Sequence, residues 1–118
     1  MELTWTKLIS FNRSLVEQIK TEPGVFRLAY KATDGAFYTF YVGSANKSLR
    51  EDLLSILDGK LDNICVKIHL ENLECFFRYT IIGLEEERKN VLKTVYDHFK
   101  PKCNASISGG QNIEINFS

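Results

Sequence analysis

The chain has 118 residues, of which 44% are hydrophobic and 12% aromatic, and this length and composition predict one domain with a single packed core. Two prolines and seven glycines argue against a long disordered or low-complexity region. Fifteen basic residues balance fifteen acidic ones, which counts against strong nonspecific binding to nucleic acid, because such binding depends on many basic contacts.

The beginning of the chain lacks the charged and apolar regions of a secretory signal, and no apolar run approaches the roughly 20 residues of a membrane-spanning helix. We therefore expect a soluble, cytoplasmic protein without a membrane partner. In that setting the three cysteines, Cys65, Cys75 and Cys103, should be reduced and mostly buried. Their wide spacing forms no CxxC or Cys/His pair typical of a zinc site.

The first predicted element is a helical lead-in over residues 5–20. Its second half has apolar residues at helical spacing, with Ser14 as a candidate cap. Pro23 and Gly24 break this helix and separate it from the segment that follows.

A hairpin follows the lead-in. Residues 25–32 alternate between apolar and polar side chains, which is typical of a half-buried strand. An Asp-Gly pair at 34–35 predicts a tight turn, and residues 36–43 form the returning strand. This second strand is aromatic on both faces, which indicates a position inside the sheet.

Two helices are predicted after the hairpin. Ser48 and Glu51 form a capping box, in which each side chain satisfies a backbone N–H at the start of the first helix. An apolar stripe continues to residue 57, and an Asp-Gly pair then ends this helix. A second, short helix is predicted over residues 62–71, and its inward side chains should be Ile64, Cys65 and Ile68.

The last elements are a strand over residues 75–82 and a long helix over 84–99. Pro101 prevents this helix from continuing, and a loop leads to a short strand over residues 113–117. The order of elements predicts an α+β domain with a small antiparallel or mixed sheet flanked by helices. The inward side of the long helix should comprise Leu84, Val91, Leu92, Val95 and Phe99.

Several short motifs occur in a fixed order on these elements. They are PGVF at 23–26, YVGSA at 41–45, LRE at 49–51, PKCN at 101–104 and GG at 109–110. This series resembles the GIY-YIG nuclease family over about residues 22–110 of the chain.

The resemblance implies a phosphodiesterase that depends on Mg²⁺ or Mn²⁺ and acts on DNA. In that family a tyrosine lies near the attacking water and the metal, and an arginine on the first helix stabilises the phosphate. A glutamate on the last helix binds the metal, and an asparagine after that helix organises the site. Together they activate water and neutralise the charge that develops on the phosphate.

Three of the family's positions are retained. Tyr41 occupies the tyrosine of the second motif, Gly43 would let the backbone turn tightly into the helix, and Asn104 matches the asparagine. Phe26 stands in place of the tyrosine of the first motif, which removes a hydroxyl group and leaves a packing group.

The family's arginine is not matched. Aligning Leu49 with the family's leucine puts Asp52 at the arginine position, and omitting a one-residue insertion puts Glu51 there. Both acids suit the positive end of the helix macrodipole, where each stabilises the helix by about 0.3–1 kcal/mol. Arg50 or Lys47 would have to reach round the helix, because neighbouring side chains on a helix point about 100° apart.

The family's glutamate is not matched either. Counting back from Asn104 leads to Leu92, or to Lys89 if the register slips. The acids Glu85, Glu86 and Glu87 lie about a turn or more too early and are typical of a solvated first helical turn. If the protein is active, Glu87 is the metal ligand that we would choose.

Three functions therefore stay open. The first is a scaffold with lost or impaired catalysis that binds nucleic acid or a protein, and the second is an active endonuclease in which displaced side chains, including Arg50, take the catalytic roles. The third is a protein-interaction module without a nucleic-acid role. Binding residues in the first two cases would be Gly43, Ser44, Lys47, Lys100 and Lys102.

Overall fold

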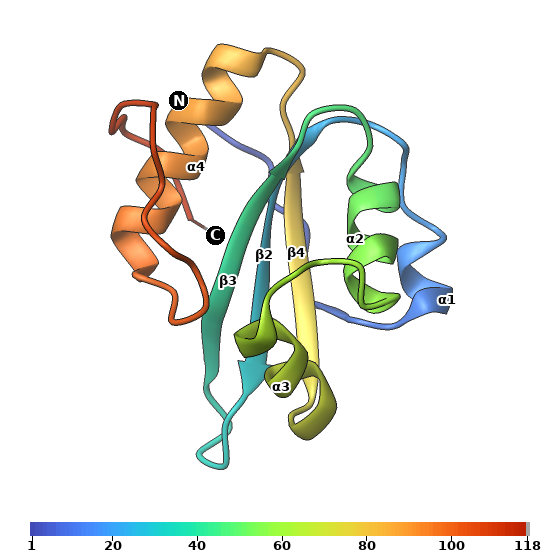
Figure 1. The fold of residues 1–118 in the computed structure, drawn as a ribbon. Helices are drawn as coiled ribbons and strands as arrows, with labels where there is room; N and C mark the ends of the chain where they lie inside the picture. The colour runs from blue at the N-terminus through green and yellow to red at the C-terminus, as the bar shows by residue number, and fades with distance from the viewer. Residues whose placement is uncertain (118) are drawn as a thin grey trace.

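A four-stranded antiparallel sheet forms the centre of the computed structural model, which describes residues 1–117. The strands lie in the order β1-β4-β2-β3, so β2 and β4 have a neighbour on each side (Figure 1). This sheet and its flanking helices confirm the predicted α+β class. The strands span Ile9–Ser10 (β1), Gly24–Lys31 (β2), Phe37–Ala45 (β3) and Cys75–Ile81 (β4).

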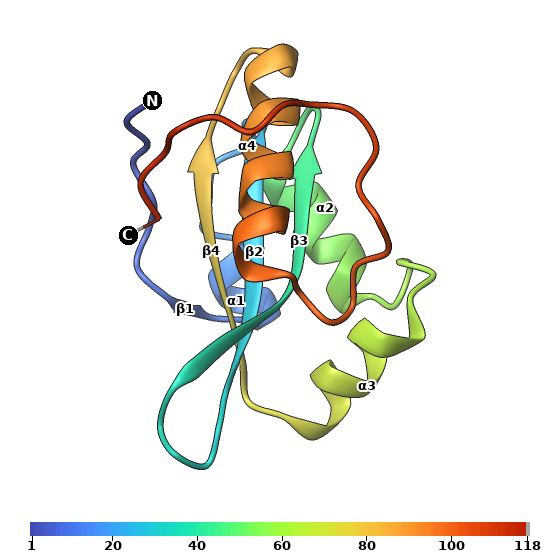
Figure 2. The ribbon, with the colours of Figure 1, turned by 90° about the vertical axis from the view of Figure 1, so that its left-hand side faces the viewer.

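Helices cover both faces of the sheet. Three of them, α1 (Arg13–Val16), α2 (Leu49–Leu57) and α3 (Ile64–Asn72), lie on one face, and α4 (Glu85–Phe99) lies on the other (Figures 1 and 2). Each face has its own cluster of buried apolar side chains. Among residues 1–117, none of the helices combines the length and the apolar composition needed to cross a membrane.

Strand β2 supplies both apolar clusters, because successive side chains of a strand point to opposite faces. Phe26 and Leu28 belong to the cluster under α2, and Val25 belongs to the cluster under α4. The first six residues of β2 are all buried, so the prediction of a half-buried strand is wrong for most of its length. The reason is that β2 is paired on both sides and covered on both faces.

The predicted place of the second hairpin strand is wrong as well. β3 pairs with β2 alone and forms an edge of the sheet. The aromatic side chains on its two faces are not all buried. Phe37 and Tyr38, near the hairpin tip, are 43% and 47% exposed. Further along, the register with β2 shifts so that Leu28 faces Tyr41 and Ala29 faces Thr39. This bulge leaves Phe40 unpaired and lets both Phe40 and Tyr41 pack on the α2 side.

The ends of the chain depart most from the predicted elements. The lead-in helix is reduced to the four residues of α1, and its cap is Asn12, whose Oδ1 accepts a hydrogen bond from the Leu15 N–H, rather than Ser14. Strand β1, which the pattern did not predict, pairs with β4. Residues 113–117 form no strand, although Ile113, Ile115 and Phe117 pack against the cluster under α4.

Two predicted helix faces are also wrong in part. On α3, Ile64 and Ile68 are 72% and 53% exposed, whereas Val66 is 1% exposed. On the long helix, Leu84 is the N-cap and is 65% exposed, while Val91 and Val95 are buried as predicted. The spacing of α3 allowed either face, since apolar side chains occur on both sides of this helix.

The Ser48 half of the predicted capping box is confirmed, whereas no described hydrogen bond joins the Glu51 side chain to the Ser48 N–H. The Ser48 hydroxyl accepts a hydrogen bond of 3.1 Å from the Glu51 N–H. We expect Ser48→Ala to lower the free energy of unfolding by about 1 kcal/mol, because a backbone donor at the helix start loses its partner. The measurement is urea denaturation, with Ser14→Ala as control. Since Asn12 caps α1, Ser14→Ala should leave stability nearly unchanged, and an equal loss in both variants would contradict this assignment.

Candidate functional site

A cavity of about 290 Å³ opens between α2 and the neighbouring halves of β2 and β3. It contains Tyr41, Gly43 and Ser44, three of the residues that the sequence singled out. A carboxylate, Asp52, and an amine, Lys60, are the charged groups that line it. The remaining lining residues are Phe26, Ser55, Ile56 and Leu61.

Tyr41 is partly buried against the aromatic ring that replaces the first-motif tyrosine. The ring centroids of Phe26 and Tyr41 are 6.1 Å apart. Burial raises the pKa of the Tyr41 hydroxyl above its ordinary value. The hydroxyl is therefore protonated at neutral pH and can donate a hydrogen bond into the cavity.

Gly43 has a different role from the predicted turn into the helix. It lies inside β3 and faces Phe26 on β2. A Cβ atom at Gly43 would lie 2.5 Å from Cζ of the Phe26 ring, which is too close for any carbon contact. The glycine is therefore required because the aromatic ring lies against its backbone.

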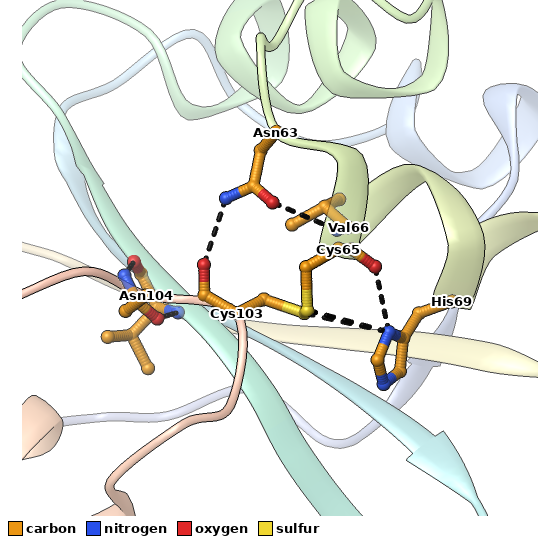
Figure 3. Close-up of a disulfide and its surroundings, with 7 residues drawn as sticks. Asn63, Cys65, Val66, His69, Cys103 and Asn104 are labelled. Carbon is orange, nitrogen blue, oxygen red and sulfur yellow. Dashed lines mark hydrogen bonds between the residues drawn. A yellow bond between two sulfur atoms is a disulfide. The ribbon is translucent and has the colours of Figure 1, made fainter.

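The Asn104 side chain forms hydrogen bonds with the backbone of β3, the strand that carries Tyr41. Its Oδ1 accepts a hydrogen bond from the Val42 N–H, and its Nδ2 donates to the Val42 carbonyl, both at 2.9 Å (Figure 3). Next to it, the Cys103 N–H donates to the Phe40 carbonyl at 2.9 Å. Since β3 is an edge strand, these bonds satisfy backbone groups that no further strand could reach.

We expect Asn104→Asp to lower the free energy of unfolding by about 1–3 kcal/mol. The carboxylate can still accept from the Val42 N–H, but it loses the donor and places a negative oxygen against the Val42 carbonyl. Denaturation of this variant should be compared with that of Asn46→Asp, a change at an exposed position. Similar stability of the two variants would show that the amide does not hold the strand edge.

Asp52 brings a negative charge to the cavity, and the sequence alignment predicted an acid in place of a cation here. Burial raises the pKa of this carboxyl above its ordinary value. Arg50 does not line the cavity, and its Nε lies 3.8 Å from Oε2 of Glu51. Lys47 is exposed in the turn before α2.

The acids of α4 lie apart from Tyr41. Glu85 pairs with Lys89 on the surface at 3.8 Å, and Glu86 is exposed. Glu87 lines a different cavity, near the N-terminal segment and Thr80. Because α4 covers the face of the sheet opposite α2, no carboxylate of this helix lines the described Tyr41 cavity (Figure 2).

The two lysines near the end of α4 also lie outside the cavity. Lys100 has a left-handed backbone, with φ of 47°, and its N–H donates to the Tyr96 carbonyl to close the helix. Lys102 is exposed in the loop that follows.

Next to Asn104, a disulfide joins Cys65 on α3 to Cys103 (Figure 3). The expectation that these two cysteines are reduced is wrong, and only Cys75 is free among the described residues. The two Cα atoms lie 5.3 Å apart although the cysteines are 38 positions apart in the sequence. Only the folding of the whole domain brings the two cysteines together, so their spacing in the sequence did not predict the disulfide.

His69 completes this cluster. Its Nδ1 lies 3.5 Å from Sγ of Cys103 and 2.8 Å from the Cys65 carbonyl, and its ring stacks on Phe40 with centroids 4.6 Å apart. Cys65, His69 and Cys103 are close enough together to share a metal ion, with ligand atoms within 4.8 Å. A cysteine binds a metal ion as its thiolate, so the disulfide removes two of the three ligands. The sequence analysis missed this cluster, and the i, i+4 spacing of Cys65 and His69 on α3 was the pattern that could have indicated it.

Comparison with solved structures identifies the fold of the chain. Two crystal structures of the GIY-YIG N-terminal endonuclease domain of UvrC from Thermotoga maritima match it with TM-scores of 0.61 and 0.58. The sequence identities are 22% and 24%, and each match covers 80% of this chain and 94% of the other. The chain therefore has the GIY-YIG fold that its motifs predicted.

Both UvrC structures are point mutants bound to the catalytic divalent cation of that domain. At this sequence identity the similarity establishes the fold and not the activity. Comparisons with models of known protein families and with curated proteins found no match.

Proposed function

We propose that this chain is a GIY-YIG-fold domain that does not cleave phosphodiesters and that acts as a binding scaffold for nucleic acid. The supporting observation is the charge of the cavity beside Tyr41. Among the described lining residues Asp52 is the only carboxylate, the Lys60 amine is the only cation, and no arginine is present.

The charge of Asp52 affects how a phosphodiester interacts with the cavity. A carboxylate repels a phosphodiester, and two like charges about 4 Å apart interact by about 1 kcal/mol in water and about 4 kcal/mol near a protein surface. A guanidinium at the same place would attract the phosphate by a similar amount and stabilise the transition state. The change of sign therefore opposes catalysis, and the Lys60 amine that also lines the cavity at most offsets the charge of Asp52.

The donor set of the cavity does not fit the family's metal site. Mg²⁺ and Mn²⁺ prefer several oxygen ligands, usually including carboxylates. The cavity offers Asp52 and the hydroxyl groups of Tyr41, Ser44 and Ser55, and the acids of α4 lie on the other face. We therefore assign no reaction step to a divalent cation here.

The test is a cleavage assay with purified protein on branched, nicked and single-stranded DNA in the presence of Mg²⁺ or Mn²⁺. We expect no cleavage above that of Tyr41→Phe, which keeps the ring and removes the hydroxyl. Metal-dependent cleavage that Tyr41→Phe abolishes would overturn the proposal and favour an active endonuclease.

Protein binding is the second candidate function, and α3 is the observation that favours it. Ile64 and Ile68, one turn apart, expose 72% and 53% of their surface. Exposed apolar side chains on one helix face are typical of an interaction surface. A salt-titrated binding assay distinguishes the candidates, because affinity for DNA should rise at low salt and the absence of any DNA binding would leave the protein-binding candidate.

A further inference from the structure

A second cavity, of about 460 Å³, lies on the opposite face of the sheet from Tyr41. Its lining comes from β2, β3 and β4, from the C-terminal end of α4, and from Leu8 and Phe117. Arg27 and Arg78 provide its cationic groups, and the residues of the described chain that line it include no acid.

The two arginines are direct neighbours in the sheet. Arg27 on β2 is paired in register with Arg78 on β4. Like charges directly opposite each other on adjacent strands destabilise a sheet, so this arrangement requires compensation. Neither guanidinium has a carboxylate partner among the ion pairs of residues 1–117.

Arg27 is held in place without neutralisation of its charge. It is 4% exposed, and its guanidinium carbon lies 4.3 Å from the Trp5 ring centroid and 4.8 Å from that of Phe99. Its Nη2 donates to the Phe117 carbonyl at 2.9 Å, while its buried Nε has no described partner. Burial, and next the charge of Arg78, lower the pKa of Arg27 to about 10. The group remains cationic at neutral pH.

Arg78 leaves more of its donors available. Its Nε donates to the Thr6 carbonyl at 2.9 Å, and no hydrogen bond from its two terminal nitrogens occurs within the described chain. The negative end of α4 near Phe99 contributes about half a unit charge, against two full positive charges. The described residues therefore give the cavity a positive potential.

We propose that this cavity binds the phosphate group of a nucleotide through Arg27 and Arg78. Two guanidinium groups match the charge of a phosphate dianion, and their planar forks suit its oxygens. The volume exceeds that of phosphate alone and falls within the range of small-molecule sites. The exposed ring of Phe37 lines the same space and offers a face for a base, whereas His98 stacks on Phe117 and the Arg27 guanidinium lies over Phe99.

The phosphate can belong to a free nucleotide or to the end of a nucleic-acid strand. Calorimetry on the full chain at low ionic strength should therefore compare inorganic phosphate, AMP and a short oligonucleotide with and without a 5′-phosphate. We expect AMP to bind more tightly than inorganic phosphate. A preference for the phosphorylated oligonucleotide over AMP would identify the strand end as the source of the phosphate, and the reverse would identify the free nucleotide.

Variants localise the binding. Arg78→Gln should weaken AMP binding about tenfold or more, because it removes a charge-assisted contact. Arg78→Lys should have an intermediate affinity, since it keeps the charge and loses the fork. Arg13→Gln, on the α2 side of the sheet, is the matched control and should bind as the unchanged chain does. Arg27→Gln is less informative, because this side chain is also part of the core.

Backbone amide shifts in NMR spectra provide an independent readout. Binding should shift the amides of Ala29 and Thr39, which line this cavity, and not that of Gly43 on the other face. Any of three results would overturn the proposal. They are no binding of any of the four probes, an AMP affinity of Arg78→Gln equal to that of the unchanged chain, and amide shifts confined to the Tyr41 cavity. None of these results depends on whether the Tyr41 cavity cleaves DNA.

Discussion

Replacing both bonded cysteines, in Cys65→Ser/Cys103→Ser, is expected to lower the free energy of unfolding by about 4 kcal/mol. The disulfide closes a loop across 38 residues of sequence, and opening it releases the unfolded chain from that constraint. A small domain depends on such a crosslink because its core is limited in size. Urea denaturation of the oxidised chain and of the double variant measures the difference.

The folded structure should survive the loss of this bond. Asn63 caps α3 by accepting from the Val66 N–H, and its Nδ2 donates to the Cys103 carbonyl at 2.9 Å. Because Cys103 also donates to Phe40, the loop keeps two hydrogen bonds to the rest of the domain. We therefore expect native amide shifts at Val42 in the double variant.

The free cysteine is the control for this experiment. Burial raises the pKa of the Cys75 thiol to about 11, so it is protonated at neutral pH and is a poor partner for disulfide exchange. Cys75→Ser should cost much less than the double substitution. A thiol assay on the unfolded, unreduced protein should find one free thiol per chain. Three free thiols, or equal stability of the oxidised chain and the double variant, would contradict the crosslink.

Gly24→Ala is expected to lower the free energy of unfolding by about 3 kcal/mol or more, or to prevent folding. Gly24 begins β2 and is paired with both β3 and β4. An added Cβ would lie 2.1 Å from the Thr80 carbonyl oxygen and 2.8 Å from Cδ1 of Leu49. The side chain of Leu49 could rotate, but the backbone of Thr80 cannot move without breaking the β2–β4 pairing.

Gly83→Ala is the matched control for this substitution. An added Cβ at Gly83 meets no described atom within 4 Å, and its φ is not positive. We expect its stability to stay within about 0.5 kcal/mol of the unchanged chain, as is usual for surface substitutions. Thermal denaturation followed by circular dichroism compares the two variants. Equal melting temperatures would show that β2 and β4 are farther apart at this point than the structure has them.

Short motifs predicted which residues gather at the Tyr41 cavity. Tyr41 and Gly43 were singled out from YVGSA, and both line the cavity. The motif alignment also placed an acid at the expected arginine position, and Asp52 lies in the cavity; its replacement of a catalytic arginine stays a prediction. The role of Gly43 was not readable, because it depends on the Phe26 ring of another strand. The location of Glu87 on the far side of the sheet likewise required the packing of α4.

By itself, the sequence determined the elements whose signals are local. Alternation, turn residues and the Ser48 cap act within a few residues, so they specified the hairpin, α2, the long helix and, through motif order, the GIY-YIG fold. Only the tertiary structure decided that β3 is an edge strand and that α3 exposes Ile64 and Ile68. The same holds for the Cys65–Cys103 bond and the Arg27–Arg78 pair, because these partners are brought together by chain reversals that no local pattern encodes.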